Sequence, residues 1–307
     1  MLALAGHGPG NHVLCLAFRP DGATLASAGD GGRALLWDLS TGGMQAHATG
    51  ARRITTCAFT PDSRFLYWDD GPNVVRLDCG TGGRQLLHPD SPDLGTFALS
   101  PDGTTLAAFT RGRLARWDGR TLRRLPAWEG EYGFGRPAFS ADGRRLAVPQ
   151  LSAETYRIEG LGFAYADPDP YGYWVAVRDT ASGEIVARLR GFGQHTGGLT
   201  LTPDGAALGA TAGPTLSLHD VATGTPRWTL RPDATHFHGI AIAPDGRTLV
   251  AGRSDGTVRL YDVATGAERS RYDFRLGKVW CVAIAPDGLR AAAGGSAGSI
   301  VVWDLDA

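Results

Sequence analysis

Short apolar runs alternate with Gly, Asp and Pro along the chain. Near the amino terminus these runs cover residues 13–18, 23–27 and 34–37, and turn-forming residues lie between them. Runs of this length that are bounded by such residues are typical of β-strands. The pattern therefore predicts a protein built from many short strands.

Two phrases repeat in step with these strands. Pro-Asp-Gly or a close variant begins at Pro20, Pro61, Pro101, Ala141, Pro203, Pro244 and Pro286. A residue followed by Asp closes each unit, at Trp37-Asp38, Leu77-Asp78, Trp117-Asp118, Arg178-Asp179, His219-Asp220, Tyr261-Asp262 and Trp303-Asp304. A Thr-Gly or Ser-Gly turn follows most of these Asp residues. Each unit is predicted to hold four strands, here a to d, with Pro-Asp-Gly turning a into b and Thr-Gly turning c into d.

This combination resembles the WD40-repeat family of β-propellers, in which each unit of 40 to 45 residues forms one four-stranded blade. The resemblance implies an all-β fold: residues 1–307 form one seven-bladed propeller of four-stranded antiparallel blades. Only units one, three and seven keep Trp-Asp, and the usual Gly-His phrase is clear only at Gly6-His7. The family's buried set of His, Ser, Asp and Trp is therefore expected to be incomplete in most blades.

The two ends of the chain are predicted to complete one blade together. Unit seven ends at residues 303–305 without a strand d, while residues 2–4 precede the first unit without a blade of their own. An amino-terminal strand in the seventh blade would close the ring and hide an edge that could otherwise pair with another chain.

The fourth unit is about twenty residues too long for a regular repeat. The excess lies at residues 150–173, between the predicted strands b (145–148) and c (174–177), and it is rich in aromatic residues. In a four-stranded antiparallel blade the b-to-c and d-to-a loops share one end, which we call the top face. The insertion is expected to rise from that face as an ordered lid or an extra hairpin.

Aromatic and acidic residues in the predicted top-face loops form the candidate partner-binding surface. The set consists of Trp68, Asp69, Asp70, Trp128, Glu131, Tyr132, Phe134, Tyr156, Tyr165, Tyr171, Phe192 and Phe237. The carboxylates favour a basic partner. The alternative is that these rings pack on one another to hold the insertion.

No catalytic residue, metal site or cofactor is predicted. The two Gly-x-Ser-x-Gly matches, at residues 252–256 and 294–298, fall in one register of the repeat, in the turn between strands b and c. Residues 167–172 resemble the start of a calcium loop, but Arg178 stands where the loop needs Glu. His195, His236 and His238 could share a metal, although the family places a structural His in that connection. Cys15 and Cys281 occupy one register of strand a and are expected to fill the core.

Composition sets the expected surroundings. The net charge is −1 and Lys278 is the only lysine, which argues against a nucleic-acid surface. The use of arginine in place of lysine is typical of a G+C-rich, bacterial-type composition. No signal segment or membrane span is recognised, so a cytoplasmic, monomeric protein without membrane contact is expected.

Two classes of function follow from the sequence. The resemblance implies a non-catalytic scaffold that docks a partner protein or peptide on the top-face loops around the insertion. The alternative is an enzyme or ligand sensor, with the insertion as a lid over the mouth of the central channel and the three histidines beneath it.

Overall fold

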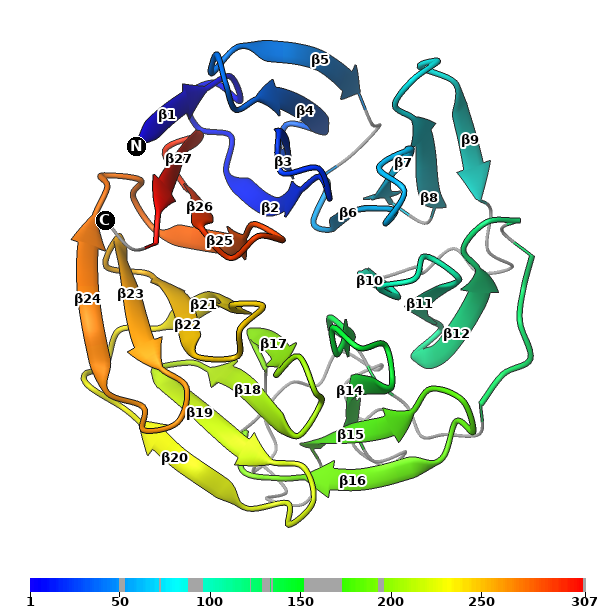
Figure 1. The fold of residues 1–307 in the computed structure, drawn as a ribbon, viewed down its shortest axis with the longest axis vertical. Coiled ribbons are helices and arrows are strands. Elements are labelled where there is room, and N and C mark those ends of the chain that lie inside the picture. Colours follow the sequence, from blue (N-terminus) through cyan, green and yellow to red (C-terminus); the bar gives the residue numbers. More distant parts are fainter. Residues whose placement is uncertain are drawn as a thin grey trace.

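Seven small sheets stand around a central axis, and the two chain ends meet in the same sheet (Figure 1). The structure is a computed structural model of residues 1–307, which describes residues 1–49, 53–71, 73–87, 96–121, 123–128, 133, 135–151, 173–192 and 196–305. All of the regular elements in these ranges are strands. The predicted seven-bladed β-propeller is therefore confirmed.

The strands of each blade follow one another from the axis to the rim. Blade one contains β2 (Val13–Phe18), β3 (Thr24–Gly29), β4 (Arg33–Asp38) and β5 (Met44–Thr49). Blade two contains β6 (Cys57–Phe59), β7 (Phe65–Asp70), β8 (Asn73–Asp78) and β9 (Arg84–Leu87). Blade three contains β10 (Phe97–Leu99), β11 (Thr105–Thr110) and β12 (Arg113–Asp118). Blade four contains β13 (Ala138–Phe139), β14 (Arg145–Leu151), β15 (Tyr173–Asp179) and β16 (Ile185–Leu189). Blade five contains β17 (Gly198–Leu201), β18 (Ala207–Ala212), β19 (Thr215–Asp220) and β20 (Pro226–Leu230). Blade six contains β21 (Phe237–Ile242), β22 (Thr248–Arg253), β23 (Thr257–Asp262) and β24 (Glu268–Asp273). Blade seven contains β25 (Val279–Ile284), β26 (Arg290–Gly295), β27 (Ser299–Asp304) and β1 (Leu2–Ala5).

The fourth position of blade three is irregular. In its place a single bridge joins Trp117 to Arg124, and the Leu125 amide donates a hydrogen bond of 2.9 Å to the Arg116 carbonyl. Pro126 follows directly and has no amide hydrogen to donate to a ladder. Blade three thus keeps the path of strand d without its regular pairing.

The turns form as their sequences predict. In the a-to-b turn of blade three, Asp102 accepts hydrogen bonds from the Thr104 amide (2.9 Å) and the Ser100 hydroxyl (2.6 Å), and Gly103 takes a φ of +70°. In the c-to-d turn of blade six, Asp262 accepts one from the Thr265 amide at 2.9 Å. The repeated Asp therefore fixes each turn through its own carboxylate.

Strand β1 closes the ring as predicted. It pairs antiparallel with β27, from Leu2 opposite Val302 to Ala5 opposite Ser299. Leu4 is buried in one core cluster with Ile300 and Val302. Chain ends far apart in sequence thus share one hydrogen-bonded ladder.

Blade one keeps three members of the family's buried polar set. His7 Nε2 lies 2.8 Å from Ser27 Oγ, and the Trp37 indole donates to the same oxygen at 2.8 Å. Burial, followed by the charge of Arg33, lowers the pKa of His7 to about 4. His7 is consequently neutral at pH 7 and belongs to the structural framework.

The insertion begins and ends at paired positions. In blade four Leu151 of β14 lies opposite Tyr173 of β15, so the chain leaves and re-enters the sheet at neighbouring points. Residues 152–172 lie outside the described residues. Within the described ranges, no helix has the length and apolar character needed to cross a membrane.

Candidate functional site at the mouth of the channel

The innermost strands of blades five, six and seven approach one another closely. A Cβ at Gly198 would come within 2.9 Å of the His238 carbonyl oxygen, and a Cβ at Gly239 would meet the Val282 amide nitrogen at 2.7 Å. Real Cβ atoms do not tolerate such distances to backbone, so glycine is required at both positions. The absence of side chains lets β17, β21 and β25 pack around the axis.

Bulges turn selected side chains toward the axis at the top of the strands. In blade one Val13 pairs with Gly29 and Cys15 with Ala28, which leaves Leu14 out of the ladder. In blade seven the same shift leaves out Trp280, and in blade six it leaves out His238 with Gly239. Bulges commonly redirect side chains in this way beside functional sites.

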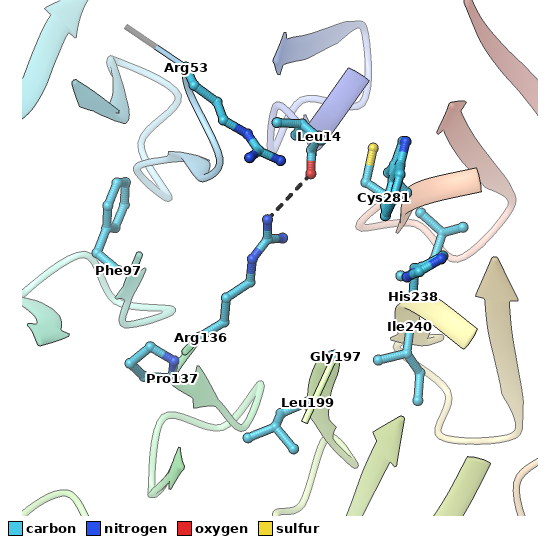
Figure 2. Close-up of a pocket in the computed structure, with 14 residues that line it drawn as sticks. Leu14, Arg53, Phe97, Arg136, Pro137, Gly197, Leu199, His238, Ile240 and Cys281 are labelled. Atoms are coloured by element: carbon cyan, nitrogen blue, oxygen red, sulfur yellow. Dashed lines mark hydrogen bonds between the residues drawn. The ribbon is translucent and has the colours of Figure 1, made fainter. Parts of the chain in front are cut away.

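These side chains surround a cavity of about 330 Å³ on the axis of the ring (Figure 2). All seven blades or the segments that lead into them contribute to its wall. The lining residues are Leu14, Arg53, Phe97, Arg136, Pro137, Gly197, Gly198, Leu199, His238, Gly239, Ile240, Trp280, Cys281 and Val282. We call this space the channel-mouth cavity.

Arg136 reaches across the axis from the segment before β13. Its Nη2 donates a hydrogen bond of 2.7 Å to the Thr55 carbonyl and makes a longer contact of 3.5 Å with the Leu14 carbonyl (Figure 2). The acceptors belong to blade one and to the chain entering blade two. The guanidinium is thereby anchored at one nitrogen across the full width of the mouth.

A small ionic group borders the cavity beside blade one. Asp30, in the b-to-c loop of that blade, contacts Arg53 Nε at 2.8 Å and His12 Nδ1 at 2.9 Å. Arg53 is 61% exposed, so its pair with Asp30 contributes little to stability. The main effect of the pair is to hold the Arg53 side chain at the rim.

The rings of Trp280 and His238 line the cavity, and His12 packs against Trp280. Trp280 stacks on His12 with centroids 5.8 Å apart and lies 4.4 Å from the His238 ring. Burial lowers the pKa of His238, and the nearby charges of His236 and Lys278 add to that effect. His238 Nε2 and Trp280 Nε1 are buried and have no hydrogen-bond partner within the described residues.

The structure corrects the predicted role of several partner-binding residues. Trp68, Phe192 and Phe237 were expected as exposed anchors, but each is at most 3% exposed and belongs to a core cluster. Phe192 packs on His219 with ring centroids 4.5 Å apart, and Phe237 meets Tyr261 edge-on. These rings pack in three separate clusters between neighbouring blades, and no contact among the three rings is seen.

Asp69 also has a structural role. Its carboxylate accepts hydrogen bonds from the Thr55 amide at 2.8 Å and the Thr55 hydroxyl at 2.7 Å, and a further one from the Thr56 amide. Burial raises its pKa although these bonds act in the opposite direction. A buried carboxylate with occupied oxygens does not attract a basic partner, so Asp69 does not support that prediction. Asp70 is half-buried, and its role stays a prediction.

Trp128 lies at the wrong end of the propeller for the predicted surface. Its ring covers Gly183 in the c-to-d turn of blade four, where a Cβ would come within 2.3 Å of the indole. The central carbon of the Arg116 guanidinium lies 3.6 Å from the centroid of the Trp128 ring. Trp128 therefore joins blades three and four near the bottom face. Glu131, Tyr132, Phe134, Tyr156, Tyr165, Tyr171 and His195 lie outside the described residues.

The sequence contains a signal for the channel-mouth cavity that the loop assignment did not use. Leu14, Thr55, His238 and Trp280 each stand six residues before the first residue of their own Pro-Asp-Gly turn. In units one, six and seven this register lies near the top of strand a. His236 and His238 are close in sequence, but no group of three potential metal ligands occurs in the described part of the chain.

Comparison with known proteins agrees with this geometry. Residues 2–38, 224–262 and 272–304 match the family model described as WD domain, G-beta repeat. Together with the seven-bladed ring, these matches confirm the resemblance to the WD40-repeat β-propellers that the sequence shows.

A curated relative matches part of the chain. The small ribosomal subunit protein RACK1y of Oryza sativa subsp. japonica is 34% identical over 128 residues, which is 37% of this chain. The match spans 36% of that relative's own length.

Proposed function

We propose that the protein is a non-catalytic interaction scaffold that docks a partner protein or peptide on its top face. The observation that carries this proposal is the channel-mouth cavity, in which rings and hydrogen-bonding groups converge from separate blades. Concave sites with a few convergent polar groups are the usual form of binding sites. The WD40 fold and a relative whose name places it in the small ribosomal subunit support a role in protein assemblies.

The docking surface is proposed to extend from the cavity to the loops around the blade-four insertion. The insertion leaves the sheet at Leu151 and returns at Tyr173, at the top end of blade four. Arg136 connects the same blade to the cavity, because it precedes β13 and lines the wall. A partner held by the cavity would therefore lie beside blade four, the blade that carries the insertion.

Affinity capture with matched variants tests this function. Residues 152–170 are replaced by a short Gly-Ser turn, and the thermal midpoint is expected to change little because closure entropy varies slowly with loop length. The partner retained by the intact protein is expected to bind the shortened protein at least about tenfold more weakly, since interface anchors typically contribute about 2 kcal/mol each.

The control is Arg227→Ala in blade five, beside the Pro203 and Pro244 turns of the bottom face. This variant is expected to retain the partner fully. Wild-type affinity in the folded shortened protein, or a loss of binding in Arg227→Ala, would contradict docking on the top face. Release of the partner in chemically altered form would favour the enzyme alternative.

A further inference from the structure

The channel-mouth cavity presents hydrogen-bond donors that the protein itself does not use. Arg136 is held through Nη2 alone, and its Nε and Nη1 make no hydrogen bond within the described residues. A guanidinium carries five N–H donors in a planar fork that matches a carboxylate. The anchor at Nη2 fixes the side chain across the mouth, so an incoming oxyanion would meet a guanidinium that is already positioned.

Two buried ring nitrogens also lack a hydrogen-bond partner within the described residues. The Trp280 indole can only donate, and its Nε1 lies buried without an acceptor. The Nε2 of His238 is likewise buried and unpartnered, in a ring 4.4 Å from Trp280. Buried polar atoms without partners are unfavourable, and acceptor oxygens of a ligand would satisfy the Trp280 indole and the His238 tautomer that is protonated at Nε2.

The charge of the wall favours the same kind of ligand. Among the described residues that line the cavity, Arg53 and Arg136 are the charged ones, and none of these described residues is acidic. The two nearby carboxylates are already engaged, Asp30 by His12 and Arg53 and Asp69 by Thr55 and Thr56. The charge of Lys278 also reaches the cavity wall, because it helps to lower the pKa of His238.

We propose that the channel-mouth cavity binds the carboxylate of an acidic residue in a partner peptide, with Arg136 as its principal ligand and Trp280 as a second donor. A cavity of about 330 Å³ accommodates a side chain rather than a folded domain. A free N–H group of the guanidinium would donate a charge-assisted hydrogen bond to one carboxylate oxygen, which is stronger than a bond between neutral groups. This inference rests on the proposed interaction function and specifies the charge of the partner as acidic, where the sequence predicted a basic one.

Titration with hexaglutamate, followed through the indole N–H signals of the eight tryptophans, tests the site. The Trp280 signal is assigned from the spectrum of Trp280→Phe. It is expected to shift saturably with hexaglutamate and to stay in place with hexaglutamine. An unmoved Trp280 signal, or an equal response to the uncharged peptide, would overturn the proposal.

Charge variants identify the ligand residue. Arg136→Gln is expected to weaken hexaglutamate binding about tenfold or more, the scale of a hydrogen bond to a charged group. Arg271→Gln removes the same charge from exposed strand β24 at the rim and is expected to leave the affinity unchanged. Equal losses in both variants would mean that only the overall charge matters. If Arg136→Gln fails to fold, exposed Arg53→Gln is expected to give a loss of about twofold to fivefold, and an unchanged affinity there would contradict the proposal.

Competition with inorganic phosphate separates a peptide site from a general anion site. Phosphate at millimolar concentration is expected to leave hexaglutamate bound. Full displacement of hexaglutamate by phosphate at the same concentration as the peptide would overturn the assignment to a peptide carboxylate. The outcome is independent of the capture experiment. A partner that docks on the top face while hexaglutamate fails to bind would refute the acidic-ligand inference and preserve the scaffold.

Discussion

Single residues in this protein differ most from expectation where a polar group is buried. His7 is 2% exposed and bonded to Ser27, and its pKa falls from the ordinary 6.5 to about 4. Arg253 is fully buried between Asp233 and Asp255 and lies 4.8 Å from the Phe237 ring centroid. Burial keeps His7 neutral in the folded chain above about pH 4, so acid changes the balance between the folded and unfolded chains.

The depressed pKa of His7 predicts a loss of stability in mild acid. As the pH falls below about 6.5, the unfolded chain binds a proton at His7 while the folded chain does not until about pH 4. The free energy of unfolding should therefore decrease across this window, by about 3 kcal/mol from His7 at the 1.4 kcal/mol expected per pH unit. Burial lowers the pKa of His219 and of His238, so both add to the loss in the same direction.

Urea unfolding at a series of pH values measures this effect. His7→Gln keeps a hydrogen-bonding side chain without the titration, so its stability is expected to vary less between pH 6.5 and pH 4. Exposed His236→Gln is the control and should keep most of the wild-type slope, because it removes only a secondary cause of the lowered His238 pKa. A wild-type slope in His7→Gln would show that His7 does not titrate as inferred.

At the scale of elements, β1 is the strand on which ring closure depends. Deleting residues 1–5 is expected to lower the free energy of unfolding by several kcal/mol, because the ladder with β27 is lost and a buried Leu alone contributes about 2 kcal/mol. The exposed edge at Ile300 and Val302 should also cause association that increases with protein concentration. Thermal melting and light scattering measure the two effects.

Leu4→Ala separates packing from edge protection. It removes the buried side chain but leaves the β1 backbone paired, so it should lower stability by about 2–4 kcal/mol without promoting association. A truncated protein that stays monodisperse and melts like the wild type would contradict the account of closure.

Across the whole molecule, the fold was predictable and the site was largely not. The Asp of each Pro-Asp-Gly turn bonds its own backbone, so regular spacing in sequence becomes regular spacing of blades. Closure by residues 2–5 followed from the missing strand of unit seven. The absence of a regular strand d in blade three was not foreseen, although Pro126 marks the place.

The site was misread because loop assignment alone does not tell a buried ring from an exposed one. Phe237 begins β21 and points into the core, whereas His238 beside it sits in a bulge at the cavity. A shift of one residue in register decides whether a side chain lies in the core or at the cavity. Arg136 shows a further difficulty, since its acceptors lie in blades one and two, far away in sequence.

Hydrogen–deuterium exchange of the protein with and without its captured partner locates the interaction site. Binding at the channel mouth should slow exchange in the segments that line the channel-mouth cavity, around residues 135–139, 237–240 and 278–282. The Pro-Asp-Gly and Thr-Gly turns of the bottom face should exchange at unchanged rates. Protection confined to those turns or to the outer strands would contradict an interaction site at the mouth of the channel.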